Sequence, residues 1–319
     1  MRIAAVTILL LSLWQSVAGT QNRPEVKPDT AQSHAQTPPP PVIDVHMHAP
    51  PRAGLKDWLA MMESLNVRHA VLIGVPAQLD ELTKAAPGRF IPSLMFPCEG
   101  GKTPSFGIQC FADGGEFPSV ALVREKVKGG GLKALGELSA QYMGVAPNDP
   151  RLEPYFSLAE ELDLPVGLHL GIGPPGVSYA SSRFPPRKSP NYRGAAGDPF
   201  LLEEVLIRHP KMRLYVMHAA WPMRDAMLYL LYMHPQVYVD ISVLQWAIPR
   251  AAYYSYLRDL VEAGFGQRIM FGSDGGPRHL KEGVQAIMEA DFLTAEQKRD
   301  ILYNNAARFF RLDEGSVRP

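Results

Sequence analysis

The sequence lacks an excess of charge of either sign and, beyond its first residues, any long apolar run. Basic and acidic side chains number 32 each, so the formal net charge at pH 7 is zero. No basic surface is available to attract nucleic acid or acidic lipid, and we expect neither as a partner. After the N-terminal segment, no stretch reaches the roughly 20 apolar residues that a membrane span requires.

Cysteine is scarce, with only Cys98 and Cys110 in the chain. In a cytosolic protein both would be free thiols, whereas an exported protein allows them to pair. The two lie in one glycine-rich loop, which makes a short cross-link sterically easy. We therefore expect a disulfide if the protein is exported.

The N-terminus has the pattern of a secretory signal peptide. Arg2 precedes an apolar run from Ile3 to about Val17, and small residues up to Ala18 suit a cleavage site. The run is short for a membrane anchor, so we predict a signal peptide at 1–18 and no stable membrane insertion after cleavage. Residues 19–41 are polar and proline-rich, which predicts a disordered linker. The expected location is periplasmic or secreted.

From residue 42 onward, short apolar runs alternate with longer amphipathic stretches. The predicted strands are Val42–His48, Ala70–Val75, Phe90–Phe96, Leu132–Leu138, Val166–Leu170, Leu214–His218, Val237–Ser242 and Ile269–Ser273. The predicted helices are Leu55–Asn66, Gln78–Ala85, Ser119–Lys128, Arg151–Leu162, Pro199–Arg208, Arg224–Met233 and Ala251–Ala263, followed by a helical region over His279–Phe310 with a break near Asp291–Thr294.

This alternation predicts an α/β fold with a parallel sheet buried on both faces. Eight such units in about 270 residues indicate a (β/α)8 TIM barrel, which we place at residues 42–315. A doubly wound open sheet is the alternative. It normally has a glycine-rich turn after its first strand, and here that turn is Ala49-Pro50-Pro51-Arg52.

Several residues with metal-binding side chains fall at the predicted carboxyl ends of strands, where barrel enzymes place their catalytic groups. His46 and His48 are two residues apart on the first strand, so both side chains point to the same face. His169, His218 and Asp274 lie at the ends of the fifth, sixth and eighth strands. Any one of them could be a hydrogen-bonded core residue, but the recurrence over four strands favours divalent metal ligands.

Three carboxylates accompany these residues. Glu137 lies in the apolar fourth strand, where burial is costly unless the group is paired or bound to a cation. A bridging position between two metals would satisfy it, and a salt bridge to Lys133 or an arginine is the alternative. We interpret Asp44 and Asp240 as groups that orient ligands or strand ends.

Other histidines have structural interpretations. His209 and His234 each precede a proline at a helix end, where a basic residue suits the negative helix terminus. His69 precedes the second strand, at the opposite end of the barrel from the predicted site.

The ordered set His46-x-His48, His169, His218 and Asp274 resembles the amidohydrolase superfamily, and within it the amidohydrolase-2 type group of metal-dependent hydrolases. This resemblance covers residues 42 to about 310. It implies that these residues bind one or two divalent metals, commonly zinc, and that Asp274 also acts as general base. Many two-metal members carry a carboxylated lysine on strand four, and here Glu137 stands at that place, which leaves the number of metals open.

The resemblance and the chemistry together predict hydrolysis of an amide, ester or lactone in a small-molecule substrate, with Asp274 and His218 as catalytic residues and His46, His48, Glu137, His169, His218 and Asp274 as metal ligands. A nonoxidative decarboxylase of an aromatic or unsaturated acid is the alternative, because Asp44 stands before His-x-His as an acidic residue often does in such enzymes. A noncatalytic metal-binding barrel is the second alternative. The oligomeric state stays open, including a homo-oligomer.

Loops rich in glycine, proline and aromatic residues are expected to select the substrate. They are Pro97–Pro118, Gln141–Asn148, Gly171–Asp198 and the turn that holds Trp221. The third contains the cluster Arg183, Arg187, Lys188 and Arg193, which either holds a substrate carboxylate or is simply solvated.

Overall fold

The computed structural model describes residues 40–104, 107–179 and 189–312. The predicted signal peptide and residues 19–39 of the predicted linker lie outside these ranges, as does the end of the predicted domain from 313 to 315. In the described part of the chain, no helix combines the length and the apolar character needed to cross a membrane.

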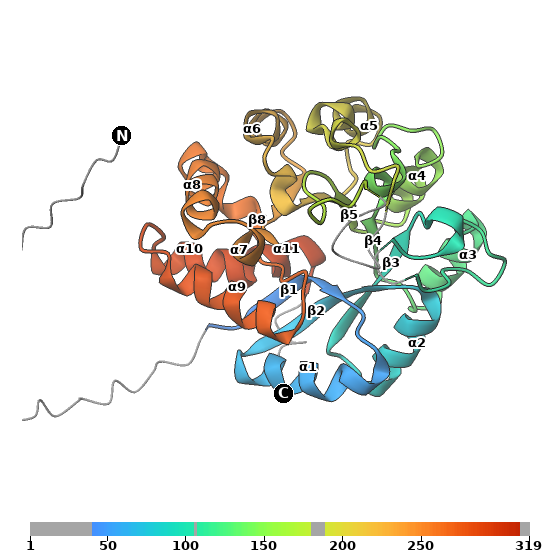
Figure 1. The fold of residues 1–319 in the computed structure, drawn as a ribbon, viewed down its shortest axis with the longest axis horizontal. Coiled ribbons are helices and arrows are strands. Elements are labelled where there is room, and N and C mark those ends of the chain that lie inside the picture. The colour runs from blue at the N-terminus through green and yellow to red at the C-terminus, as the bar shows by residue number, and fades with distance from the viewer. Residues whose placement is uncertain (1–39, 105–106, 180–188, 313–319) are drawn as a thin grey trace, which may run out of the picture. The chain divides into compact units, whose positions relative to one another are not determined.

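Eight parallel strands form one sheet in the sequential order β1 to β8, as the sequence predicted (Figure 1). Their bounds are β1 Val42–His48, β2 Val67–Gly74, β3 Phe90–Phe96, β4 Ala134–Leu138, β5 Val166–His169, β6 Leu214–Met217, β7 Val237–Asp240 and β8 Ile269–Met270. Backbone hydrogen bonds from Val45 to Phe271 and from Asp274 to His46 join the first strand to the residues that follow the last. The fold is therefore a (β/α)8 barrel.

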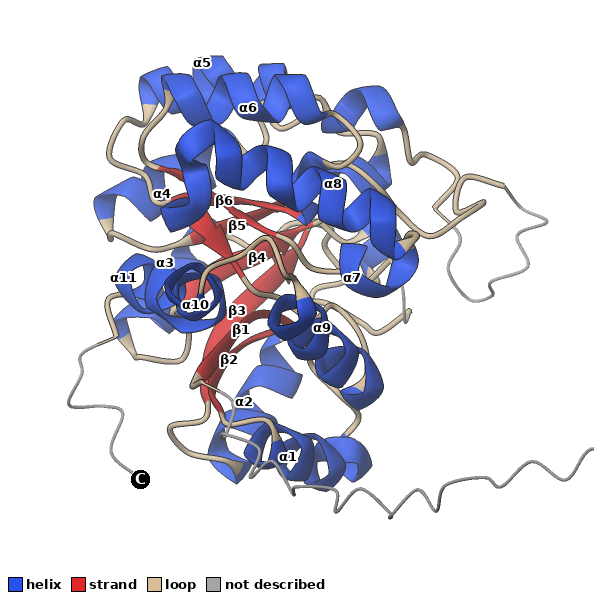
Figure 2. Cartoon of the chain, turned by 90° about the vertical axis from the view of Figure 1, so that its left-hand side faces the viewer, coloured by secondary structure: helices blue, strands red, loops and turns tan. Residues whose placement is uncertain are grey.

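Helices enclose the strands, as Figure 2 shows. Their bounds are α1 Leu55–Ser64, α2 Pro76–Ala85, α3 Val120–Lys128, α4 Glu153–Glu161, α5 Glu203–Arg208, α6 Arg224–Met233, α7 Leu244–Ala247, α8 Arg250–Leu260, α9 Pro277–Glu289, α10 Ala295–Arg299 and α11 Asn305–Phe310. The sequence did not predict α7, and the single helix predicted over Pro199–Arg208 is a 3₁₀ turn followed by the short α5.

In β3 and β6, apolar side chains alternate between two layers, which is the physical reason that such segments form a buried parallel sheet. One layer packs under the helices, and the other contains Ile43, Val45, Val71, Ile73, Tyr215 and Met217. The Tyr215 hydroxyl donates to the carbonyl of Val45 across 3.2 Å, which links β6 to β1. Phe309 and Phe310 of α11 pack against this second layer.

β2 spans Val67–Gly74 rather than the predicted Ala70–Val75, β4 begins two residues later than predicted, and β5 to β8 end earlier than predicted. β6 ends at Met217, and His218 begins a 3₁₀ turn over His218–Ala220. β7 ends at Asp240 and β8 at Met270, three residues before the predicted end. The residues after these strands leave the ladder because their side chains and backbone take part in the polar cluster described below.

The expected disulfide is present. Cys98 and Cys110 are bonded to each other, across 12 positions of sequence, and both are buried. The cross-link closes the loop that follows β3 and holds it against the barrel. The backbone bond from Cys110 to the carbonyl of Gly101, at 2.9 Å, supports the same closure.

Candidate metal centre

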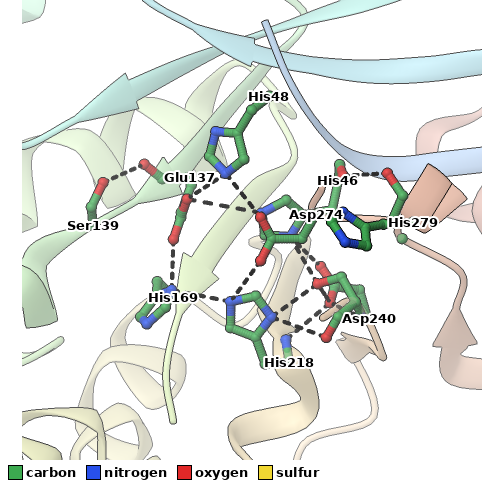
Figure 3. Close-up of polar contacts among 12 residues, drawn as sticks. His46, His48, Glu137, Ser139, His169, His218, Asp240, Asp274 and His279 are labelled. Atoms are coloured by element: carbon green, nitrogen blue, oxygen red, sulfur yellow. Dashed lines mark hydrogen bonds and ion pairs between the residues drawn. The ribbon is translucent and has the colours of Figure 1, made fainter. Parts of the chain in front are cut away.

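The two histidines of β1 converge on one pair of carboxylates (Figure 3). The His48 Nε2 atom lies 3.1 Å from Asp274 Oδ1 and 3.3 Å from Glu137 Oε2. The His46 Nε2 atom lies 3.6 Å and 3.8 Å from the same two oxygens. His46 is fully buried and the His48 side chain is 19% exposed, so the cluster opens to solvent on the His48 side.

Glu137 uses its two carboxylate oxygens in different directions. Oε2 faces the two histidines of β1, and Oε1 lies 2.6 Å from His169 Nδ1. Its ion-pair partners among the described residues are these three histidines. The alternative salt bridge to Lys133 or an arginine is not formed among these residues. The carboxylate thus stands between two groups of imidazoles, which is the arrangement of a bridging ligand.

His169 and His218 form the second imidazole group. Their facing atoms, His169 Nδ1 and His218 Nε2, are 3.2 Å apart, and His218 Nε2 is 3.8 Å from Asp274 Oδ2. Both side chains are buried. Asp274 therefore resembles Glu137 in directing one oxygen to each group.

Two of these residues have backbone conformations that side-chain-bearing residues rarely adopt. His218 has φ of 57° and Asp274 has φ of 45°. Each such left-handed residue costs about 1–3 kcal/mol and persists only where the surroundings enforce it. Here the His218 amide donates to Asp240 Oδ1 at 2.9 Å, and the Asp274 amide donates to the His46 carbonyl at 2.8 Å.

The two carboxylates predicted to orient other groups lie beside the cluster. Asp240 Oδ2 accepts from His46 Nδ1 at 3.0 Å, so it contacts the side of the ring opposite to Nε2. Asp44 accepts from the amides of His46 and Ser273 and from the Ser273 hydroxyl, and thereby fixes the end of β1 to the chain after β8. Asp44 thus stabilises the backbone around the site, while Asp240 orients the imidazole of His46.

Burial and neighbouring charged groups act in opposite directions on the pKa values of most side chains in this cluster. Burial disfavours charged His46 and His48, but neighbouring carboxylates outweigh it and raise the pKa of His46 to about 9 and that of His48 to about 10. Burial likewise opposes ionisation of Asp274, yet the facing histidines lower its pKa to about 2. The pKa of Glu137 is also lowered, against burial, by His169 and His48. Burial, aided by His169, lowers the pKa of His218 to about 4.

The residues present fit one or two divalent cations. Groups of three potential ligands whose donor atoms lie within 4.8 Å of one another include His46, His48 and Glu137 on one side, and Glu137, His169 and His218 on the other. The buried His46 Nε2 has no hydrogen-bond partner among the described residues, which is costly unless a cation takes the place of the proton on that atom. Imidazole nitrogen with carboxylate oxygen is a donor set that suits zinc.

The histidines interpreted as structural lie apart from this cluster. His209 lies between Glu153 and Glu160, with Nε2 and Nδ1 at 2.7 Å and 3.2 Å from their carboxylates. His69 lies inside β2 rather than before it, because the strand begins at Val67, and its ring contacts the carbonyl of Gly88 at 3.1 Å. The backbone carbonyl of His234 accepts from Arg268 at the end of α6.

Of the predicted basic cluster, Arg183, Arg187 and Lys188 lie outside the described residues. The Arg193 guanidinium donates to the carbonyls of Pro190 and Tyr192, each at 2.8 Å.

Three features near the cluster were not predicted from the sequence. The Gln141 amide donates to the Gly171 carbonyl and to the Tyr192 hydroxyl, each at 3.0 Å, and so ties together two of the loops expected to select the substrate. The His279 ring stacks on Trp246 with centroids 4.1 Å apart. Ser242 contacts both His46 and His218. Each contact joins segments that are distant in sequence, so no local pattern signals it.

Comparison with known proteins gives a family match over almost the whole barrel. A family model described as Amidohydrolase matches residues 43–312. A curated relative, protein fluG of Emericella nidulans, is 23% identical over 168 residues, which are 47% of this chain and 18% of the relative. The chain therefore spans less than a fifth of that protein's length.

Solved structures with the same fold cover most of the chain at low sequence identity. An uncharacterized TIM-barrel protein from Bordetella bronchiseptica aligns with a TM-score of 0.60 at 15% identity, over 86% of this chain and 99% of that one. A probable 2-pyrone-4,6-dicarboxylic acid hydrolase from Acinetobacter baumannii aligns at 0.55 and 13%, over 85% and 99%. A 5-carboxyvanillate decarboxylase from Novosphingobium aromaticivorans, complexed with manganese, aligns at 0.57 and 13%, over 85% and 96%.

Proposed function

The chain belongs to the amidohydrolase family, and on that premise we propose that it is a metal-dependent hydrolase that cleaves an amide, ester or lactone. The observation that carries this proposal is the position of Glu137 between two groups of imidazoles. A carboxylate with one oxygen toward each group suits two cations, and paired cations in one site favour hydrolytic displacement by activated water.

We assign the ligands to two positions. One would be held by His46, His48 and Asp274, and the other by His169 and His218, with Glu137 shared. Zinc is the proposed cation because nitrogen and carboxylate ligands in this number suit it. When bound there, a divalent cation would lower the pKa of the attacking water to about 7 and would polarise the substrate's carbonyl oxygen.

Asp274 is the proposed general base. In the cation-free protein the facing histidines lower its pKa to about 2, against the effect of burial, so the carboxylate is ionised at neutral pH. It takes a proton from water as the oxygen forms a bond to the carbonyl carbon. When the bond from that carbon to the leaving nitrogen or oxygen breaks, Asp274 returns the proton to the leaving group. His218 Nε2 lies 3.8 Å from Asp274 Oδ2, and its proposed part is that of a metal ligand beside the base.

Decarboxylation is the second candidate, and the likeness to a manganese-containing 5-carboxyvanillate decarboxylase favours it. Asp44 argues against it. An acidic residue before His-x-His would act in the site, but Asp44 Oδ1 accepts from the amides of His46 and Ser273, and Oδ2 accepts from the Ser273 hydroxyl. The cluster of six ligand-type side chains also argues against a noncatalytic barrel. Burying charged groups together lowers the stability of the fold, and such clusters are typical of functional sites.

A product assay separates these candidates. Zinc-loaded and manganese-loaded protein is incubated with panels of lactones, esters and amides, and separately with aromatic and unsaturated carboxylic acids. Hydrolysis of at least one panel, with the oxygen of labelled water appearing in the product and no carbon dioxide released, is the expected result. Carbon dioxide release from the acids without any hydrolytic activity would replace the proposal by the second candidate.

We also propose that the enzyme works outside the cytoplasm, in the periplasm or the medium. The Cys98–Cys110 disulfide supports this, because such bonds persist mainly in oxidising compartments. Cell fractionation followed by N-terminal sequencing is the test. A mature protein that begins near residue 19 in the exported fraction is expected, and full-length protein confined to the cytoplasm would contradict the proposal.

A further inference from the structure

Ser242 is a buried serine just beyond β7, and its hydroxyl lies among three side chains at the candidate metal centre. The Ser242 Oγ atom is 2.5 Å from Asp240 Oδ1, 2.9 Å from His218 Nδ1 and 3.0 Å from His46 Nδ1. One side chain thus contacts a ligand candidate from each of the two imidazole groups.

A count of protons fixes the direction of these bonds. The Asp240 carboxylate can only accept, and its Oδ1 already receives the amides of His218 and Ser242, each at 2.9 Å. The single hydroxyl proton of Ser242 therefore goes to Asp240, over the shortest of its three contacts. Toward the two imidazoles, Ser242 Oγ can therefore only accept. Both rings must donate an N–H from Nδ1.

The two histidines depend on Ser242 to different degrees. His46 Nδ1 has a second acceptor in Asp240 Oδ2, at 3.0 Å. The acceptors at His218 Nδ1 are both parts of Ser242, namely Oγ at 2.9 Å and the backbone carbonyl at 3.2 Å. Removal of the hydroxyl leaves His218 only the longer of the two contacts.

The opposite edge of the His218 ring agrees with this assignment. His169 Nδ1 is 2.6 Å from Glu137 Oε1, so it carries a proton that it donates to that carboxylate. The same His169 atom is 3.2 Å from His218 Nε2. Because the protonated His169 Nδ1 has no lone pair, it cannot accept a proton from His218, which agrees with an unprotonated His218 Nε2.

We infer that Ser242 is a positioning residue that holds the proton of neutral His218 on Nδ1 and thereby directs the Nε2 lone pair toward Glu137 and Asp274 as a metal ligand. The sequence carries no sign of this role, because Ser242 and His218 are 24 positions apart. Groups that orient metal-binding histidines typically change metal affinity by about 10- to 100-fold when they are removed. The inference rests on the proposed two-cation site only for its second readout below.

The first readout is the tautomer of His218 in cation-free protein. Nitrogen-15 histidine NMR is recorded at a pH where His218 is neutral, with its signals assigned by comparison with His218→Gln. Wild-type protein is expected to show the Nδ1–H form, and Ser242→Ala a clear shift toward the Nε2–H form. Ser242→Thr, which keeps the hydroxyl, should restore the wild-type signals. An unchanged tautomer in Ser242→Ala overturns the inference.

The second readout is zinc affinity by competition with a chelator. Ser242→Ala is expected to bind the more weakly held ion about 10- to 100-fold less tightly, with the other ion affected less. Thr83→Val, which removes a hydroxyl that bonds a backbone carbonyl on the outer helix α2, is the matched control and should change neither affinity. Lost affinity without a tautomer change would mean a merely structural role and would also overturn the inference. A single ion in wild-type protein would count against the proposed function and leave the NMR result to decide on Ser242.

Discussion

Metal binding is expected to expel protons from the site. In the cation-free protein, the pKa is about 9 for His46 and about 10 for His48, so both rings are charged at pH 7. Each must lose its Nε2 proton before that nitrogen can bind a cation. The two pKa values lie about 2 and 3 units above pH 7, and at 1.36 kcal/mol per unit the two deprotonations cost about 7 kcal/mol.

The sign of the pH dependence follows from this competition. Rising pH removes the competing protons, so the apparent affinity for zinc should increase about 100-fold per pH unit while both rings are protonated, and level off above their pKa values. His218, with its pKa lowered to about 4, contributes no proton at pH 7.

Calorimetry measures the number of protons directly. Zinc is titrated at pH 7 into cation-free protein in buffers of different ionisation enthalpy, and the dependence of the observed heat on that enthalpy gives the protons released. Wild-type protein should release about two. His48→Gln should release about one fewer, and His234→Gln, at the end of α6, should match the wild type. Zinc binding with no proton release, or with affinity that falls as pH rises, would refute the reasoning.

Further outcomes follow from other parts of the structure. Asp274→Asn should keep the fold, as judged by circular dichroism, but lose at least about 100-fold in kcat, the contribution of a general base; wild-type turnover would exclude Asp274 from that role. Replacing Cys98 and Cys110 by serine removes the disulfide, and urea denaturation should show a loss of about 3 kcal/mol. Equal thiol titres before and after reduction of unfolded wild-type protein would show instead that no such bond forms.

The barrel was predictable because each of its units carries its own signal. Apolar runs of strand length alternate with amphipathic stretches, and this local pattern needs no knowledge of contacts between distant residues. The positions of His46, His48, His169 and Asp274 followed from the same alternation, because the carboxyl ends of the strands of a barrel meet at one face. The side chains of His46, His48 and His169 converge on Glu137, and Asp274 faces both histidines of β1.

The backbone conformations and hydrogen bonds that position the ligand candidates could not be predicted from this pattern. The left-handed backbone of His218 and Asp274 is unfavourable for both residue types and is held by bonds to Asp240 and His46. The role of Ser242 depends on three side chains from three different parts of the chain. Sequence periodicity reports which face a residue occupies, but the partner of a buried polar atom is set by tertiary packing.

The count of metal ions per chain tests the central claim most directly. Purified mature protein is loaded with zinc, dialysed and measured by mass spectrometry of the metal, beside Glu137→Ala and, as a control, Glu153→Ala, whose side chain pairs with His209 away from the site. The account predicts two ions in wild type and in the control, and one ion in Glu137→Ala. One ion in wild-type protein, unchanged by the loss of Glu137, would contradict the bridging role and favour decarboxylation.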